Sequence, residues 1–222
     1  MTPSKKSNSA TPFCKVCFKS FTAPSWRTLF GEEVPLCEDC LREMNPQMRY
    51  WKVEGIEVCS LYFYNGKVRD LLYQFKGCGD IELAPIFLAY QAPLLRFLYR
   101  GYTLVPAPSF EEKNEARGFN HVELMFAPLK LPIVKALRKL DDVKQANLHY
   151  DDRQKIGEHL ALVPGVSLAG KKVLFVDDLF TTGATAKACC HLLREAHPSR
   201  LKILVMGYTP EKGLEELRNA PS

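Results

Sequence analysis

The sequence predicts an α/β fold in which a parallel sheet is flanked by helices and preceded by a small cysteine-containing module. Apolar segments of strand length, among them residues 103–105, 172–176 and 201–208, alternate with segments of helical pattern. This alternation favours a parallel sheet that is buried on both faces. Two C-x-x-C pairs lie near the N-terminus, in a stretch too short to bury a core without a metal or another cross-link.

The predicted elements follow one another without an internal repeat. Residues 58–64 form a β-rich run closed by the turn signal Asn65-Gly66, and helices are predicted at 68–75 and at 81–100, the second with a break at Pro93. After the strand at 103–105, a charged mobile stretch is predicted at 110–117, followed by a helix at 118–129 and a strand at 130–134. A short helix or irregular segment is expected at 135–140 and a polar loop with a helical piece at 141–158. The last predicted elements are a strand at 172–176, a helix at 183–196 and a strand at 201–208.

Composition places the chain among soluble globular proteins, with 46% hydrophobic and 25% charged residues. The net charge of +5 is compatible with a polyanionic partner but does not indicate one. The polar start of the chain lacks the apolar core of a signal peptide. Residues 83–99 are mostly apolar, yet they are fewer than the roughly 20 needed to cross a bilayer. We therefore expect no transmembrane segment, and three parts: a disordered tail at 1–12, a cysteine module at 13–50 and a larger domain at 51–222.

The two cysteine pairs predict a structural zinc site. Cys14 and Cys17 form one pair, Cys37 and Cys40 form the other, and 19 residues separate them. Four thiolates complete a tetrahedral zinc shell and leave no position open for catalysis. Two disulfides or a redox-active pair are the alternatives, and both fit a reducing compartment less well. For the cysteines at 59, 189 and 190 we expect buried packing, and the loop thiol Cys78 has no assigned role.

A phosphate-binding loop is predicted where the strand at 172–176 ends. Asp177 and Asp178 follow the strand, and a helix begins after a short hydroxyl-rich loop that comprises Thr181, Thr182, Gly183, Ala184 and Thr185. Free N–H groups at the start of a helix attract an anion, and glycine lets the backbone approach a phosphate closely. Two adjacent carboxylates would repel that phosphate unless they accept hydrogen bonds from sugar hydroxyls or have a metal ion nearby. The pattern indicates a site for a ribose 5-phosphate; an ordinary strand–loop–helix with a threonine-rich cap is the alternative.

The run from 173 to 185 closely resembles the binding signature of type I phosphoribosyltransferases, with Phe180 in place of the usual aliphatic residue. This resemblance implies 5-phosphoribosyl 1-pyrophosphate as the ligand, bound with Mg²⁺. Arg117-Gly118-Phe119 resembles the pyrophosphate-contacting loop of purine-type members, so Arg117 is expected to bind the pyrophosphate, or else to form surface ion pairs. Lys113 is a weaker candidate for the same role. Asp177, Asp178 and Arg117 are the candidate catalytic residues.

The chain as a whole resembles the ComF (ComFC) family of amidophosphoribosyltransferase-like competence proteins. Beyond the motifs above, this resemblance rests on the following segments and residues: 75–77, 79–80, 105–108, 117–120, Gln145 and Arg153. The family commonly has an asparagine three residues after that arginine, where this chain has Ile156. The resemblance implies a type I phosphoribosyltransferase fold over 51–222, a zinc finger at 13–50, and a protein of natural transformation.

Two functions follow from this resemblance. In the first, a cytoplasmic protein, with peripheral association at the inner membrane as an option, handles incoming single-stranded DNA alongside the DNA-uptake machinery. Aromatic and basic residues interleave near the N-terminus, as in proteins that stack bases and track phosphates; the alternative is that the aromatic residues pack the core of the cysteine module. They are Lys5, Lys6, Phe13, Lys15, Phe18, Lys19, Phe21, Trp26, Arg27 and Phe30. In the second, the chain is an active phosphoribosyltransferase with an unidentified acceptor, in salvage or regulation.

Overall fold

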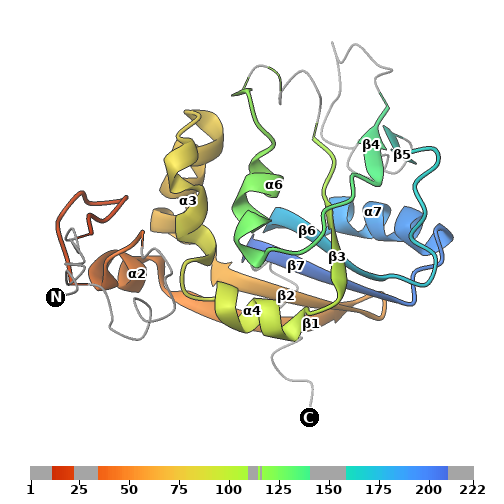
Figure 1. Cartoon of the computed structure of the whole chain (residues 1–222), viewed down its shortest axis with the longest axis horizontal. Helices are drawn as coiled ribbons and strands as arrows, with labels where there is room; N and C mark the ends of the chain where they lie inside the picture. Colours follow the sequence, from red (N-terminus) through yellow and green to blue (C-terminus); the bar gives the residue numbers. More distant parts are fainter. Residues whose placement is uncertain (1–11, 23–34, 110–114, 116, 141–158, 210–222) are drawn as a thin grey trace, which may run out of the picture.

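A computed structural model of the chain describes residues 12–22, 35–109, 115, 117–140 and 159–209. Its centre is a five-stranded sheet in the order β1-β2-β7-β6-β3. The strands are β1 (Pro46–Val53), β2 (Ile56–Phe63), β3 (Tyr102–Pro106), β6 (Lys172–Phe180) and β7 (Arg200–Tyr208). β2, β7, β6 and β3 run parallel to one another, whereas β1 pairs antiparallel with β2. The predicted α/β fold is confirmed, with a mixed rather than a purely parallel sheet (Figure 1).

The antiparallel strand β1 has a local cause. Glu54 and Gly55 join β1 to β2, and both have positive φ angles, 50° and 78°. Two-residue connections of this kind reverse the chain into a hairpin. β1 was not predicted from the sequence, and the boundary that we predicted at residue 50 falls inside it.

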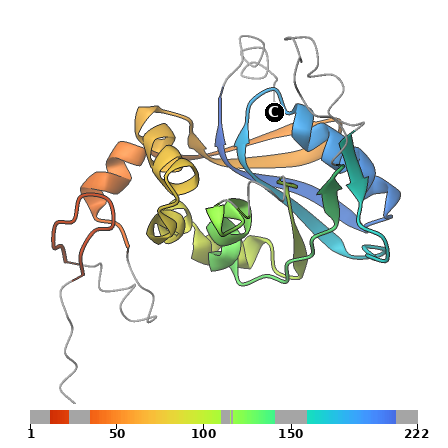
Figure 2. The same ribbon diagram turned by 90° about the horizontal axis from the view of Figure 1, so that it is seen from above.

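Helices cover both faces of the sheet (Figure 2). α7 (Ala184–Glu195) and the two-stranded ribbon of β4 (Leu137–Lys139) and β5 (Leu160–Leu162) lie over one face. The other face carries α3 (Gly66–Leu72), the π-helix η1 (Tyr73–Gly77), the 3₁₀ helix η2 (Ile81–Leu88), α4 (Ala92–Leu98), α6 (His121–Phe126) and the short 3₁₀ turn η3 (Ala127–Leu129).

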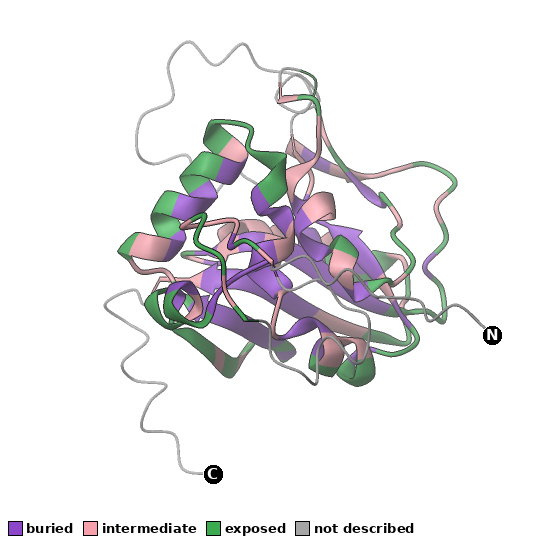
Figure 3. Cartoon of the chain, turned by 60° about the vertical axis from the view of Figure 1, so that its left-hand side comes forward, coloured by how far each residue is buried: buried purple, intermediate pink, exposed green. Residues whose placement is uncertain are grey.

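Alternate residues of β6 divide between the two hydrophobic cores, as the period of a strand requires. Val173 and Phe175 belong to the core beneath α7, whereas Leu174 and Val176 belong to the core beneath α3, η2, α4 and α6. Figure 3 shows the strands as mostly buried and the outward faces of the helices as exposed. This explains why β6 appears in the sequence as an uninterrupted apolar run.

Several predicted elements differ in the structure. The helix expected at 81–100 is interrupted, as predicted, but the break lies at 89–91, just before Pro93. It divides the segment into η2, which ends at Leu88, and α4, which begins at Ala92. The short helix or irregular segment expected at 135–140 contains strand β4, because these residues pair with β5. The strand expected at 130–134 is reduced to one bridge between Ile133 and Leu104. The predicted segments at 110–114 and 141–158 lie outside the described residues, as do Lys113, Gln145, Arg153 and Ile156.

Within the part of the chain that the structure describes, no single helix is both long enough and apolar enough to cross a bilayer. η2 and α4 pass the same test of length and hydropathy only as a pair, which is bent by 64°.

The cysteine module is joined to the main domain by packing. Its helix α2 (Glu38–Met44) ends at Asn45, which adopts a left-handed conformation and leads directly into β1. Leu36 and Met44 are fully buried, in the same hydrophobic core as α3 and α6. Tyr90 donates a hydrogen bond to the carbonyl of Leu36. The tail predicted at 1–12 lies almost entirely outside the described residues.

Candidate functional site

The candidate site lies at the carboxyl ends of the parallel strands, where ligands bind in open α/β sheets. Asp177 and Asp178 occupy the last part of β6, which continues to Phe180. β3 ends alongside them, and the N–H of Ala107 donates to the carbonyl of Val176. β2 leads at the same edge into α3 and η1. Three connections that follow parallel strands therefore meet around the two aspartates.

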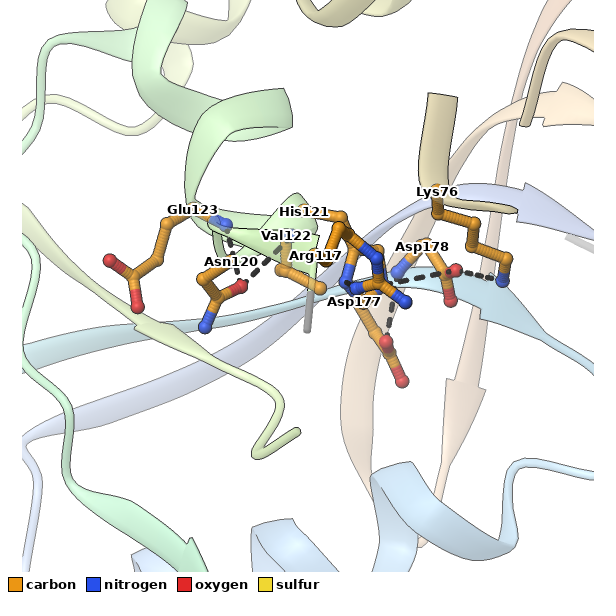
Figure 4. Close-up of polar contacts among 8 residues, drawn as sticks. All are labelled: Lys76, Arg117, Asn120, His121, Val122, Glu123, Asp177 and Asp178. Carbon is orange, nitrogen blue, oxygen red and sulfur yellow. Dashed lines mark hydrogen bonds and ion pairs between the residues drawn. The ribbon is translucent and has the colours of Figure 1, made fainter. Parts of the chain in front are cut away.

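Asp178 is the centre of a polar network drawn from three elements (Figure 4). The Nζ atom of Lys76, in η1, lies 2.5 Å from Oδ2 of Asp178. The Nε2 atom of His121, at the start of α6, lies 3.4 Å from the same oxygen. Burial alone would raise the pKa of Asp178, but the hydrogen bond from His121 and the charge of Lys76 outweigh it and hold the pKa below its ordinary value. Asp178 is therefore ionised at neutral pH.

Arg117 completes this network through His121. Its NH1 group lies 3.0 Å from Nδ1 of His121. Because a guanidinium can only donate, Nδ1 must accept, and the ring proton then sits on Nε2 and points to Asp178. Arg117 also lies over the ring of Phe119, 5.7 Å from its centroid. The residue predicted to contact pyrophosphate thus stands at the site, one side chain away from the aspartates.

Asp177 has a different environment from its neighbour. Burial, together with the charge of Asp178, raises the pKa of Asp177 well above its ordinary value. Its Oδ1 accepts a hydrogen bond of 2.9 Å from the N–H of Asp178. Asp178 is thus kept ionised by Lys76 and by the N–H of His121. Asp177 instead favours its protonated form as long as no positive charge or hydrogen-bond donor compensates its own charge.

The predicted phosphate loop follows directly. α7 begins at Ala184, with Gly183 as its N-cap, and no side chain caps the helix from that position. Thr182 accepts a hydrogen bond from the N–H of Ala184, while Thr181 is exposed and Thr185 is half-buried. An N-terminus of this kind, with hydroxyls beside it, can hold an anion.

Phe180 and Gly183 depend on each other. Phe180 is buried and packs edge-on against Trp51 of β1, with 5.3 Å between ring centroids. Gly183 has a φ angle of 71°, and a Cβ atom there would overlap the Phe180 ring. The aromatic residue in place of the usual aliphatic one therefore fills a space beside β1 and lies directly under the turn of the loop.

Lys76 and His121 were not predicted as site residues. Lys76 lies in the segment 75–77 that carries part of the family resemblance, and His121 is one of the five histidines of the chain. The signal that could have found His121 is its place directly after the segment 117–120 that carries the family resemblance. No local pattern links Lys76 to Asp178, since Asp178 is 102 residues away in the chain.

The four cysteines of the N-terminal module come together. Their sulfur atoms all lie within 4.8 Å of one another, and Sγ of Cys17 is 3.7 Å from Sγ of Cys37. Tetrahedral bonds of about 2.3 Å to zinc place sulfur atoms about 3.8 Å apart, so the donor set fits a metal of that kind. Burial would raise the pKa of Cys14, but hydrogen bonds from backbone groups, including the N–H of Val16, lower it to about 6.

The remaining cysteines behave as expected. Cys59, Cys189 and Cys190 are buried, and Cys78 is exposed in the loop after η1. Within the described residues, the cluster of four is the one group of cysteine, histidine and acidic side chains that is arranged to hold a metal ion.

Comparison with known families matches residues 135–220 to the phosphoribosyl transferase domain. A solved hypoxanthine-guanine phosphoribosyltransferase from Bacillus anthracis is 15% identical and aligns with 60% of this chain and 73% of its own, at a TM-score of 0.40. The matched domain, the topology and the carboxylate loop together define a type I phosphoribosyltransferase fold with an added cysteine module.

Among curated proteins, competence protein ComFC of Streptococcus pneumoniae is 27% identical over 168 residues, which are 75% of this chain and 72% of that protein. ComFC of Bacillus subtilis is 31% identical over 138 residues, or 61% of this chain and 57% of that protein. The resemblance to ComF proteins that the motifs predict is confirmed, since the chain is similar in sequence to both ComFC proteins.

Proposed function

We propose that the chain is a cytoplasmic ComF-type protein of natural transformation, which handles incoming single-stranded DNA and binds 5-phosphoribosyl 1-pyrophosphate with Mg²⁺. The observation that carries the ligand assignment is the position of Asp177 and Asp178 at the end of β6, beside the N-terminus of α7. Two carboxylates next to an anion site fit a ligand that offers both a phosphate and a pair of hydroxyls.

Each group of the site has a defined task under this proposal. The backbone N–H groups and hydroxyls of the 181–185 loop bind the 5′-phosphate, and Asp177 and Asp178 accept hydrogen bonds from the ribose 2′- and 3′-hydroxyls. Arg117 contacts the pyrophosphate, to which its guanidinium can offer two parallel N–H donors. Mg²⁺, when bound with the ligand, supplies charge neutralisation for the pyrophosphate oxygens.

Calorimetric titration with the magnesium complex of 5-phosphoribosyl 1-pyrophosphate tests this assignment. The wild type should bind, and Asp177→Ala/Asp178→Ala should lose binding, whereas Asp70→Ala, which removes an exposed acid on α3, should bind as the wild type does. No binding to the wild type would refute the assignment. Pyrophosphate release in the presence of a nucleobase or DNA acceptor would favour the active transferase instead.

Zinc is the proposed metal of the cysteine module. The module has little core of its own, and binding of a structural zinc contributes about 10–16 kcal/mol in comparable small folds. Purified protein should contain one zinc per chain by elemental analysis. Cys40→Ser should lose it, and Cys78→Ser, which changes a thiol outside the cluster, should keep it. Full zinc content in Cys40→Ser would contradict the assignment.

The cysteine module also offers a surface for single-stranded DNA. Phe13 and Phe18 are 67% and 77% exposed, and Lys19 lies exposed beside them. Phe21 instead packs against the core, and Lys15 pairs with Glu82 of η2. Two of the interleaved aromatic residues are therefore free to stack on bases, whereas Trp26 and Phe30 lie outside the described residues.

Substitution tests this surface better than truncation, because removing residues 1–50 would cut β1 out of the sheet. Phe13→Ala/Phe18→Ala should weaken binding to a labelled single strand by about 1–3 kcal/mol for each stacked base. Phe97→Ala removes an equally exposed aromatic ring from α4, at 78%, and should leave binding unchanged. Equal affinity of all three proteins would remove the module from the DNA interface.

A further inference from the structure

We propose that Lys76 is a positioning residue of the phosphoribosyl site, which neutralises Asp178 so that an anionic sugar phosphate can bind beside two adjacent carboxylates. The observation is the short contact between Nζ of Lys76 and Oδ2 of Asp178, which joins η1 to β6. This inference rests on the proposed function, because it concerns how the same site accepts its ligand.

The turn that carries Lys76 is fixed in place. Residues 73–77 form a π-helix, a form that is rare and frequent at functional sites. Phe75 is fully buried, with its ring centroid 5.4 Å from that of Phe87 and 5.5 Å from that of Phe119. Phe119 belongs to the segment that carries Arg117 and leads into α6. The same aromatic contacts therefore place Lys76 and His121 around one carboxylate.

Lys76 brings a full positive charge to Asp178. His121 donates from Nε2 as a neutral ring, because its Nδ1 accepts from Arg117. Arg117 therefore acts on Asp178 only through that ring. Among the described contacts of Asp178, the ammonium of Lys76 is the direct charge partner. Without it, an uncompensated carboxylate would lie in the same site that must hold a phosphate and a pyrophosphate.

Neutralisation of Asp178 and direct contact with the ligand predict different couplings. If Lys76 acts through Asp178, its removal matters only while Asp178 carries a charge. If Lys76 touches the ligand, its removal costs the same affinity whether residue 178 is charged or neutral. A double-mutant cycle separates these two roles.

The experiment is calorimetric titration with magnesium pyrophosphate, a probe that lacks the ribose hydroxyls assigned to Asp178. Lys76→Met should weaken binding about tenfold or more, in the range of coupling between charges in contact. Lys76→Arg should retain binding because it keeps the charge. The Asp178→Asn variant should still bind the probe, because pyrophosphate lacks the hydroxyls assigned to Asp178. In that background, the added Lys76→Met change should cost nothing further.

An equal loss from Lys76→Met in both backgrounds would overturn the proposal in favour of direct ligand contact. No loss in either background would overturn it as well. If Lys76→Met alone does not fold, a further loss of binding in Lys76→Met/Asp178→Asn relative to Asp178→Asn still overturns the proposal, because neither variant leaves an unpaired carboxylate. If the wild type binds neither pyrophosphate nor 5-phosphoribosyl 1-pyrophosphate, the proposed function itself is refuted. That result differs from a double-mutant cycle in which the wild type binds but Lys76 and Asp178 show no coupling.

Discussion

The two sides of the site are built in opposite ways. The loop side, from Asp177 to Thr185, is one continuous segment that runs from the end of β6 into the first turn of α7. The helical side is assembled from Lys76 on η1, from Arg117 in the segment that precedes α6, and from His121, the first residue of α6. The first is specified by consecutive residues, whereas the second exists only because the fold brings distant segments together. A motif can therefore reveal what a site binds while hiding the residues that adjust its charge.

The largest expected effect is on the helical side of the site, where removal of the buried Phe75 ring should lower the stability of the protein. Phe75→Ala leaves a cavity between Phe87 and Phe119, and we expect a loss of about 3–5 kcal/mol in the free energy of unfolding. Tyr73→Ala changes an aromatic residue of the same π-helix that is 68% exposed, and should cost about 0.5 kcal/mol or less. Chemical denaturation measures both. Similar losses in the two variants would show that the turn is not anchored through Phe75.

On the loop side, a substitution at Gly183 should lower both stability and ligand binding. Gly183→Ala combines a left-handed backbone with overlap of the Phe180 ring, which together should cost about 2–4 kcal/mol and abolish ligand binding. Gly170→Ala is the matched control, because Gly170 has nearly the same φ angle, 70°, in open space. It should cost about 1–2 kcal/mol and leave binding intact. Thermal unfolding and titration with ligand separate the two effects, and equal behaviour would refute the role of Phe180.

The aspartates should respond to pH in opposite directions. A lowered pKa makes Asp178 stabilising above its unfolded value of about 4, and that contribution disappears as the pH falls. A raised pKa makes Asp177 lower the stability as the pH rises above about 4. At pH 7, Asp178→Asn should therefore destabilise the ligand-free protein by about 1–3 kcal/mol.

Asp177→Asn should raise the stability of the ligand-free protein at pH 7 and still weaken ligand binding. Denaturation curves at several pH values check both variants. If the two substitutions shift stability in the same direction, the two aspartates do not differ in charge state as described.

The features that could be predicted from the sequence are those formed by residues close together in the chain. The cysteine pairs, the strand at 172–176 and the carboxylate loop each form continuous patterns, and the structure brings the four cysteines together as expected. β1 escaped prediction because it begins with Pro46, is mostly exposed and includes Arg49 and Lys52. Its strand character comes from pairing with β2, and through Trp51 it supports Phe180 in the loop.

The helical side of the site could not be predicted for a related reason. Lys76 lies in a π-helix, which no periodic pattern in the sequence predicts, and its partner Asp178 is 102 residues away. β4 and β5 are three residues each and acquire their form from each other. Contacts of this kind depend on the packing of the two layers on the sheet rather than on any local preference.

A crystal structure of the protein soaked with 5-phosphoribosyl 1-pyrophosphate and Mg²⁺ would show where each group of the ligand binds. We expect the 5′-phosphate against the backbone N–H groups of 181–185, the ribose hydroxyls on Asp177 and Asp178, and Lys76 still paired with Asp178. Ligand bound elsewhere, or a sugar whose hydroxyls do not contact the two aspartates, would contradict this expectation.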